Sequence, residues 1–436
     1  MEHILIIFSF LLILSIIISI INEKFFKLST DIALISFSFL FFLVIRIIVE
    51  IFKIDLSSNT IYSLLKEINL HEFLTEGVLC FMLFANASRL KFKKLVNNIK
   101  TVSALGFFTS VAFSLIFGTS LYIILKLLGL NLNFIYCILL GAILTPSEPF
   151  AILHSLSKKG FDKTLETNLE GEALINDGVG IALFVFFKHL ITSKITFTSV
   201  LELLFLKIFG AVLIGFVISF LFFKLFTITK NPIIHIYISL ATVMICFVLC
   251  EHFGFSGDMA CVVSGIYFSY KRQQKSNYFS VIDNKGYYDH FWKIVDSMLN
   301  SILFVLLGSY ILIFNIDINI IILSLLAVLL NIVSRYLSVI LTTIPFSPRA
   351  LSNYSKSNFS LITSWFGLKG GVSLALALST AHFLNNNIYL FIIWSTYITV
   401  CFSMVIQGIL ANKILTFVNM LEKDKDIKKF KGEKAK

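Results

Sequence analysis

Apolar residues run through this chain in long continuous stretches that short polar segments separate. Many of the stretches reach or exceed about 20 residues, the length of an α-helix that crosses the hydrocarbon core of a bilayer. Polar and apolar positions do not alternate, as they would in the strands of a membrane β-barrel. The pattern predicts about 13 transmembrane helices, at residues 4–21, 32–51, 70–88, 101–127, 133–153, 168–190, 198–226, 233–251, 255–270, 296–314, 318–344, 358–382 and 388–414.

The composition supports the same class of protein. Of the 436 residues, 57% are hydrophobic and 14% are charged, whereas soluble globular domains contain about 25% charged residues. The sequence therefore predicts an all-α polytopic membrane protein. The net charge of +11 is explained by basic loops on the cytoplasmic side of the membrane. No nucleic-acid-binding motif competes with this interpretation.

Lysine and arginine residues are unevenly distributed among the predicted loops. With the N-terminus outside, the inside loops hold the basic segments at 24–27, 89–100, 158–163, 224–230, 271–293, 349–356 and beyond 413. The outside loops hold few basic residues, and this bias predicts an odd number of spans with a cytoplasmic C-terminus. The first apolar stretch lacks a basic leading flank and a cleavage site, so we expect an uncleaved helix. The predicted location is the plasma membrane.

Two of the predicted spans contain residues that interrupt a helix. In the fifth span, Pro146 and Pro149 surround Ser147 and Glu148, and a proline lacks an N–H and disfavours helix in the residue before it. In the twelfth span, the segment WFGLKGGVSLAL places three glycines around Lys369. Unpaired backbone cannot face lipid, so both interruptions are expected to be buried in protein or to line a water-filled cavity.

The positions of the interruptions suggest an internal duplication. Residues 4–190 and 233–414 each contain six predicted spans, a linking helix at 198–226 joins them, and the fifth span of each half is interrupted. The two halves would then be inverted repeats, and paired interrupted helices crossing near the midplane mark the binding site of secondary transporters. We predict one transporter domain at 1–414 and a charged cytoplasmic tail at 415–436. Two unrelated kinks are the alternative.

A few charged residues lie within the predicted spans, where each costs about 2.5–3.5 kcal/mol on insertion scales and suggests a functional site. A nearby span end or an opposite charge one turn away accounts for Arg46, Glu76, Lys126 and Lys207. Neither accounts for Glu148, Glu172, Asp177, Arg335 and Lys369.

Two of these carboxylates lie on one predicted helix but point in different directions. Glu172 and Asp177 are separated by about 140° around the helix axis. We expect Glu172 to pair with Arg335 and hold the bundle together, because a guanidinium stays charged when it is buried. Asp177, beside Asn176, would face a cavity and bind a monovalent cation through oxygen. Partial desolvation of a carboxylate lets protons compete with the cation.

The charges at the interruptions match the dipoles of the broken helices. Helix N-termini favour an anion such as Glu148, and helix C-termini favour a cation such as Lys369. For both residues, purely structural compensation of the dipoles is the alternative to a role in ion binding. No cofactor is predicted, because the cysteines show no metal-ligand spacing and the chain contains no phosphate-binding loop.

Taken in order, several motifs resemble those of the NhaP-type sodium/proton antiporters, of the monovalent cation:proton antiporter superfamily. The segments are GAILTPSEPFAIL, LETNLEGEALINDG, FGFSGDMACVVSG, FWKIVDSMLNSILFVLLG, SRYLSV and WFGLKGGVSLALALS. The resemblance covers nearly the whole chain. It implies a 13-span fold, a homodimer and an elevator-like movement of a six-helix core.

The resemblance also implies roles for individual residues. Asp177 would be the ion and proton carrier, with Glu148, Ser147 and Asn176 as the other residues of the ion-binding site. The pair Asn176-Asp177 would mark electroneutral exchange. Glu172 and Arg335 would form the structural ion pair, and Ser147-Glu148 stands where the family has Thr-Asp.

The chain departs from the family pattern in several places. Ala173 replaces a serine whose hydroxyl helps to ligate the ion, and Ala85, beside Asn86, replaces an acid. Glu148 replaces an aspartate, and Lys369 stands where arginine is common. These departures leave the choice among sodium, lithium and potassium open.

The leading hypothesis is a secondary active antiporter that exchanges a monovalent cation for protons, with sodium as the leading candidate for the cation. A potassium/proton antiporter of the same fold is the nearest alternative, and a passive cation channel is another. A membrane enzyme such as an intramembrane aspartyl protease would need a Gly-x-Gly-Asp setting, but Phe255 occupies the first of these positions before Asp258. The prediction is therefore that the protein is not an enzyme.

Overall fold

The computed structural model describes residues 2–53, 77–90, 92–149, 153, 162–192, 197–275, 286–313, 318–346, 351–352 and 354–420. These residues are almost entirely helical, and no strand occurs among them. The α-helices are α1 (Glu2–Ile21), α2 (Thr30–Phe52), α5 (Leu79–Ser88), α6 (Phe92–Asn97), α7 (Ile99–Ser103), α8 (Thr109–Leu127), α9 (Phe134–Ile143), α11 (Lys163–Thr192), α12 (Phe197–Ile228), α13 (Pro232–His252), α14 (Gly257–Gln274), α16 (Tyr287–Ile313), α17 (Ile318–Thr343), α19 (Lys356–Phe366), α20 (Gly371–Leu378) and α21 (Asn386–Phe402).

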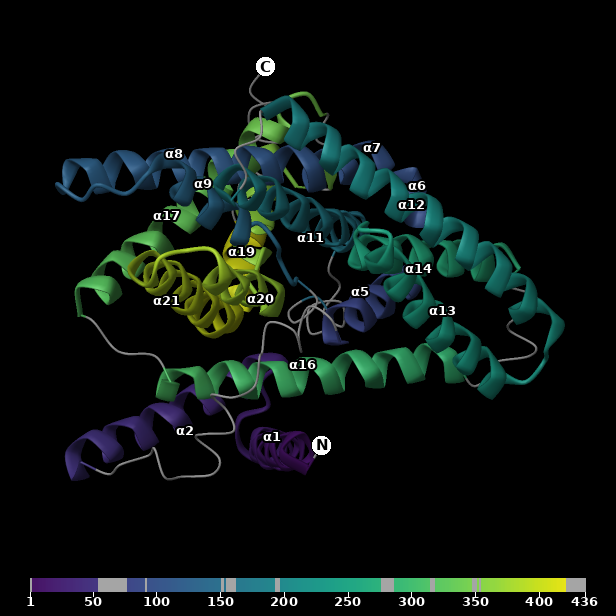
Figure 1. Ribbon diagram of the computed structural model, residues 1–436, viewed down its shortest axis with the longest axis horizontal. Coiled ribbons are helices and arrows are strands. Elements are labelled where there is room, and N and C mark those ends of the chain that lie inside the picture. Colours follow the sequence, from purple (N-terminus) through teal and green to yellow (C-terminus); the bar gives the residue numbers. More distant parts are fainter. Residues whose placement is uncertain are drawn as a thin grey trace, which may run out of the picture.

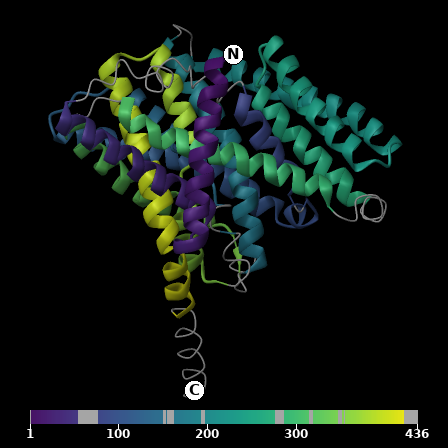
Figure 2. The same ribbon diagram turned by 90° about the horizontal axis from the view of Figure 1, so that it is seen from below.

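The helices form two groups that lie side by side. Helices α8, α9, α17, α19, α20 and α21 lie towards the left of Figure 1, whereas α5, α12, α13 and α14 lie towards the right. Helix α16 extends beneath both groups, and α1 and α2 pack against it (Figure 1). Figure 2 shows the same separation of the α12–α14 group from α21. We call α8, α9, α11, α17, α19, α20 and α21 the core helices, and α1, α2, α5, α12, α13, α14 and α16 the scaffold helices.

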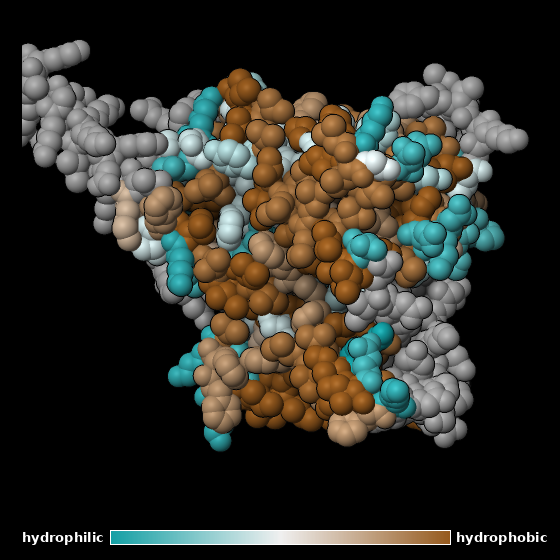
Figure 3. All heavy atoms as spheres, turned by 90° about the vertical axis from the view of Figure 1, so that its left-hand side faces the viewer, coloured by the Kyte–Doolittle hydropathy of each residue, from teal (hydrophilic) through white to brown (hydrophobic). Residues whose placement is uncertain are grey.

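The outer surface is apolar enough to face lipid. Among the described residues, nine helices are long and apolar enough to cross a membrane, or ten if α19 and α20 are counted as one bent span. Apolar side chains cover most of the face in Figure 3. On α17 the exposed apolar residues recur every three or four positions, at Ile318, Ile322, Leu325, Leu329, Val333, Leu337 and Leu341. The prediction of an all-α polytopic membrane protein is confirmed.

Both predicted helix interruptions are present. Helix α9 ends at Ile143, and residues 145–148 are not helical. Helices α19 and α20 are separated by a short break and bent by 56°. The residues responsible are the prolines of the first interruption and the glycines of the second, as predicted from the sequence.

Some predicted boundaries were wrong. Helix α16 begins at Tyr287, well before residue 296, so Lys293 lies on a helix and not in the predicted inside loop. The last helical segment continues to Met420, beyond the predicted start of the tail at 415. The first error arises because hydropathy locates the apolar part of a helix, whereas α16 begins with the mixed segment YYDHFWKIV. In the last helix, the mostly apolar segment LTFVNM continues beyond residue 414. The predicted span 70–88 is described only from residue 77, so Glu76 lies outside the described residues.

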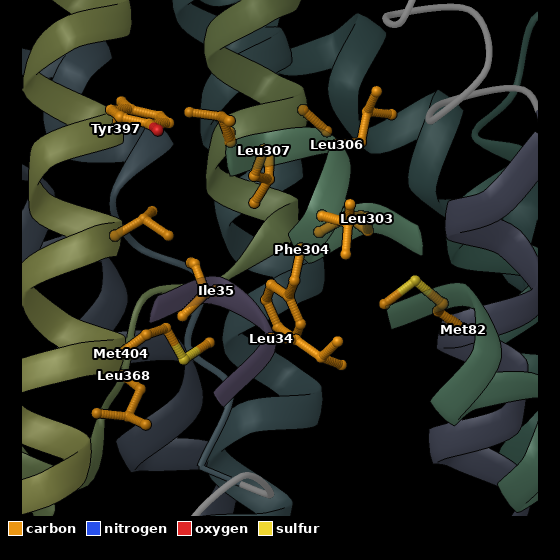
Figure 4. Close-up of a cluster of buried hydrophobic side chains, with 14 of the residues drawn as sticks. Leu34, Ile35, Met82, Leu303, Phe304, Leu306, Leu307, Leu368, Tyr397 and Met404 are labelled. Carbon is orange, nitrogen blue, oxygen red and sulfur yellow. The ribbon is translucent and has the colours of Figure 1, made fainter. Parts of the chain in front are cut away.

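Apolar packing joins the core helices to the scaffold helices. Leu303, Phe304, Leu306 and Leu307 of α16 lie among Leu34 and Ile35 of α2, Leu368 of the second interruption, and Tyr397 and Met404 of the C-terminal segment (Figure 4). A Cβ added at Gly371 would collide with the Leu303 side chain. The absence of a side chain at the start of α20 therefore allows the second interruption to pack directly on α16.

Candidate functional site

The two interruptions meet inside the protein. The Glu148 N–H donates to the Leu368 carbonyl at 2.8 Å, and the Gly371 N–H donates to Glu148 Oε1 at 2.9 Å. Each break therefore supplies a partner for backbone groups that the other break leaves outside a helix. This reciprocal pairing satisfies the requirement that buried backbone groups be hydrogen-bonded.

The Glu148 carboxylate lies at the N-terminus of α20. A helix N-terminus has unpaired N–H groups and a partial positive charge, so a carboxylate is stabilised there. The approach leaves no room for a side chain at Gly370, where an added Cβ would collide with the Glu148 carboxylate. One Glu148 oxygen is thus engaged in capping α20, and the side chain remains partly exposed.

Ser147 and Asn176 hold the first interruption against α11. Asn176 Nδ2 donates to Ser147 Oγ at 2.6 Å, and the Ser147 N–H approaches Asn176 Oδ1 at 3.4 Å. Both residues are buried, at 2% and 0% exposure. The Asn176 amide is therefore occupied in fixing the non-helical segment, and Ser147 lies next to the Asn176-Asp177 pair.

Asp177 contributes a carboxylate oxygen that is available to a ligand. The residue lies near the middle of α11 and is 9% exposed. Its Oδ1 atom is buried and has no hydrogen-bond partner among the residues that the structure describes. Glu148 and Lys369 lie within electrostatic range of its carboxylate. Since buried polar atoms are normally paired, this unpartnered carboxylate oxygen is a candidate position for a ligand.

Glycine residues on α11 allow the close packing around Asp177. A Cβ at Gly180 would come within 2.7 Å of Pro146 Cδ, so a larger residue would push α11 away from the first interruption. A Cβ at Gly178 would come within 2.8 Å of the Met259 sulfur on α14. The segment that follows Asp177 is thus packed tightly between a core interruption and a scaffold helix.

Glu172 lies on a different face of α11 and contacts Arg335 of α17. Arg335 Nη2 donates to Glu172 Oε1, and both side chains are almost completely buried. The guanidinium also packs over Gly367, where an added Cβ would come within 3.0 Å of Nε. The pair therefore connects α11 and α17 with the end of α19.

Lys369 connects the second interruption to the first. Its Nζ donates to the Thr145 carbonyl at 3.3 Å and lies 4.7 Å from the centre of the Phe113 ring on α8. The residue is fully buried. The Thr145 carbonyl follows the C-terminal end of α9, where a cation compensates the helix dipole.

Several charged residues considered from the sequence have their own partners or positions outside this hydrogen-bonded group. Arg46 pairs with Glu50 at 2.7 Å on α2. Asp258 lies in the first turn of α14, where its Oδ1 is buried and without a partner among the described residues. Arg89, which charge bias placed in an inside loop, ends α5 and pairs with Asp296 of α16 at 2.6 Å.

Sequence reasoning missed some residues that complete the site. Thr145 and Phe113 contact the Lys369 ammonium. Nothing in the sequence distinguishes them from the other residues of their apolar stretches. Ser403 accepts a hydrogen bond from the Lys369 N–H at 2.9 Å. Polar side chains in the last apolar stretch could have indicated Ser403 and its neighbour Gln407, but nothing in the sequence connects them to Lys369.

Interrupted helices that meet beside a buried carboxylate, within a membrane-spanning helical bundle, define a secondary transporter. The model of the family "Sodium/hydrogen exchanger, transmembrane" matches residues 13–416. The chain belongs to this family.

Similar proteins cover most of the chain. The Na(+)/H(+) antiporter NhaP of Pseudomonas aeruginosa is 26% identical over 394 residues, covering 89% of this chain and 91% of that protein. The Na(+)/H(+) antiporter NhaH of Halobacillus dabanensis is 27% identical, covering 76% and 80%. The fold is similar to the structure of the sodium proton antiporter MjNhaP1 from Methanocaldococcus jannaschii at pH 8, with a TM-score of 0.73, 20% identity and coverage of 95% and 99%.

Proposed function

We propose that this protein is a secondary active antiporter that exchanges a monovalent cation for protons, with sodium as the leading candidate for the cation. The observation that supports this function best is the buried, unpartnered Oδ1 of Asp177, in the described part of the chain, at the meeting point of two interrupted helices. A single carboxylate that binds either a cation or a proton exchanges them when its access alternates between the two sides of the membrane. The family membership and the names of the relatives point to the same function.

Each neighbouring residue has its own role in this proposal. Asp177 binds the cation or the proton, with Ser147 as a neutral oxygen ligand beside it and Asn176 fixing Ser147. Glu148 caps α20 and adds negative charge near the cation, while Lys369 compensates the end of α9. Glu172 and Arg335 maintain the architecture of the core. Because one acid carries both substrates, the exchange of one cation for one proton is electroneutral.

The wider arrangement of the protein is part of the same proposal. The chain has 13 transmembrane helices in two inverted repeats, lies in the plasma membrane, and has its N-terminus outside and its C-terminus in the cytoplasm. It forms a homodimer through its scaffold helices, against which the core helices move. The contacts between α20 and α16 are apolar and lack the directionality of hydrogen bonds, which suits a moving interface.

Proteoliposomes that contain a pH-sensitive dye test the function. We expect addition of sodium outside to make the interior alkaline, at a rate that a membrane potential imposed by a thiocyanate gradient leaves unchanged. Lithium and potassium, tested in parallel, define the cation preference, and choline and protein-free liposomes serve as controls. A cation-dependent current without a pH change would instead indicate a channel, and no response to any of the three cations would exclude the proposed exchange.

Ala173 offers a second test, because it lies one turn before Asp177 on the same face of α11. Ala173→Ser adds a hydroxyl oxygen next to the proposed cation. We expect the cation concentration at half-maximal exchange to fall by about three- to tenfold, the effect of one additional polar interaction. Ala211→Ser, at a buried position on α12, is the matched control. An unchanged half-maximal concentration would place the cation elsewhere.

A further inference from the structure

The last membrane helix contains a π-helical turn next to the second interruption. Helix α21 ends at Phe402, residues Ser403–Gln407 form the π-turn, and the helix then continues to Met420. Such turns are rare, because they disturb the regular i→i−4 hydrogen bonds of an α-helix, and they occur frequently at functional sites. The sequence of this segment contains no proline that would require the irregularity.

The π-turn provides a hydrogen-bond chain that ends on the backbone of Lys369. The Lys369 N–H donates to Ser403 Oγ at 2.9 Å, and Ser403 Oγ donates to Gln407 Oε1 at 2.5 Å. Ser403 and Gln407 are buried, at 0% and 2% exposure. A serine hydroxyl has one proton, so donation to Gln407 turns an oxygen lone pair towards Lys369.

The same turn also contacts the helix on the other side of the interruption. Trp365 Nε1 of α19 donates to the Gln407 carbonyl at 3.1 Å. The Gln407 side chain therefore acts on Lys369, within the break, through Ser403. The Gln407 carbonyl binds Trp365, at the end of α19. The irregular segment of the last helix fixes both the point where α19 ends and the non-helical residues that follow.

We propose that Ser403 and Gln407 are positioning residues for the cation site, which rests on the proposed antiport function. Neither residue contacts Asp177. They hold the Lys369 backbone, the Lys369 side chain holds the Thr145 carbonyl, and Thr145 lies two residues before Ser147. The chain of contacts thus extends from the last helix, through both interruptions, to the group beside Asp177. Its function is to keep the cation ligands in the binding geometry before the cation arrives.

Three variants test this chain of contacts. Gln407→Met has nearly the same shape but lacks the acceptor for Ser403, and Ser403→Ala lacks the hydroxyl. The double variant measures whether the two residues act together. Thr399→Val is the matched control, because the buried Thr399 hydroxyl donates within its own helix, to the Ser395 carbonyl at 2.6 Å.

Two measurements are made on each purified full-length variant. The first is hydrogen–deuterium exchange of peptides that contain the Lys369 amide, which does not depend on transport. The second is the cation concentration at half-maximal exchange in proteoliposomes, normalised to folded protein. In each single variant, we expect the exchange rate of the Lys369 amide and the half-maximal cation concentration to rise by about three- to tenfold. This is the effect of losing one hydrogen bond. The maximal rate should stay within about twofold, and the double variant should resemble Ser403→Ala alone.

The outcomes distinguish a positioning role from a merely structural one. A lower maximal rate with an unchanged half-maximal concentration would indicate a structural role and overturn the proposal, as would additive effects in the double variant. Unchanged amide exchange would show that the chain of contacts does not fix Lys369. The wild-type protein could also show no cation transport while the variants still show faster exchange of the Lys369 amide. This result would refute the antiport function but support the hydrogen-bond chain.

Discussion

Asp177→Asn is expected to abolish cation-driven proton movement in proteoliposomes, to the level of liposomes without protein. The substitution keeps the shape of the side chain but removes the negative charge that a cation or a proton neutralises. Since Oδ1 of Asp177 has no hydrogen-bond partner among the described residues, the fold should tolerate the change. The variant should therefore be produced in normal amounts and give a single peak in size-exclusion chromatography.

A binding measurement makes this result specific for the cation site. A ligand that binds the folded state raises the melting temperature, so sodium should stabilise the wild-type protein but not Asp177→Asn. Glu166→Gln, in the first turn of the same α11, is the matched control and should retain both exchange and stabilisation. Should Asp177→Asn still exchange cations for protons, Glu148 would become the better candidate for the carrier.

The second large effect is expected for the ion pair between Glu172 and Arg335. Removing one partner leaves an unpaired charge in the protein interior, which costs about 3–5 kcal/mol. Glu172→Gln and Arg335→Met should each reduce the yield of monodisperse protein and lower its melting temperature. Glu50→Gln, in the exposed pair with Arg46, removes a surface interaction of about 0–1 kcal/mol and should have little effect.

A double variant distinguishes a structural pair from a transport residue. Replacing both partners by apolar residues, in Glu172→Leu with Arg335→Met, removes both buried charges and should restore much of the lost stability. Recovery of stability together with cation exchange would establish that the pair serves the architecture. If instead the double variant is stable but has a strongly altered cation affinity, Glu172 takes part in binding.

The sequence was sufficient to predict those features that follow from local chemistry. The apolar stretch at 198–226 corresponds to helix α12, Phe197–Ile228, because a long continuous apolar run can be recognised from the local sequence alone. The prolines at 146 and 149 located the first interruption, because their effect on helix geometry does not depend on the rest of the fold. The glycines around Lys369 located the second in the same way.

Features that depend on distant parts of the chain could not be predicted. The contact between Arg89 and Asp296 joins residues 207 positions apart, and neither periodicity nor charge bias indicates it. The π-turn at Ser403–Gln407 depends on hydrogen bonds to Trp365 and Lys369, which exist only in the folded protein. The hydrogen bond from the Asn176 amide to Ser147 likewise forms only when the first interruption lies against α11.

The apolar surface of α16 has a further consequence for movement of the core. Buried or partly buried residues of similar size follow one another at four-residue intervals along this helix, at Leu299, Leu303, Leu307 and Ile311. Gly371 at the start of α20 packs against Leu303. In the proposed movement, a displacement of the core by four residues along α16, about 6 Å at 1.5 Å per residue, would bring Gly371 to a neighbouring leucine. Under the proposed function, the scaffold would offer similar apolar side chains at regular steps, so that two positions of the core would differ little in energy.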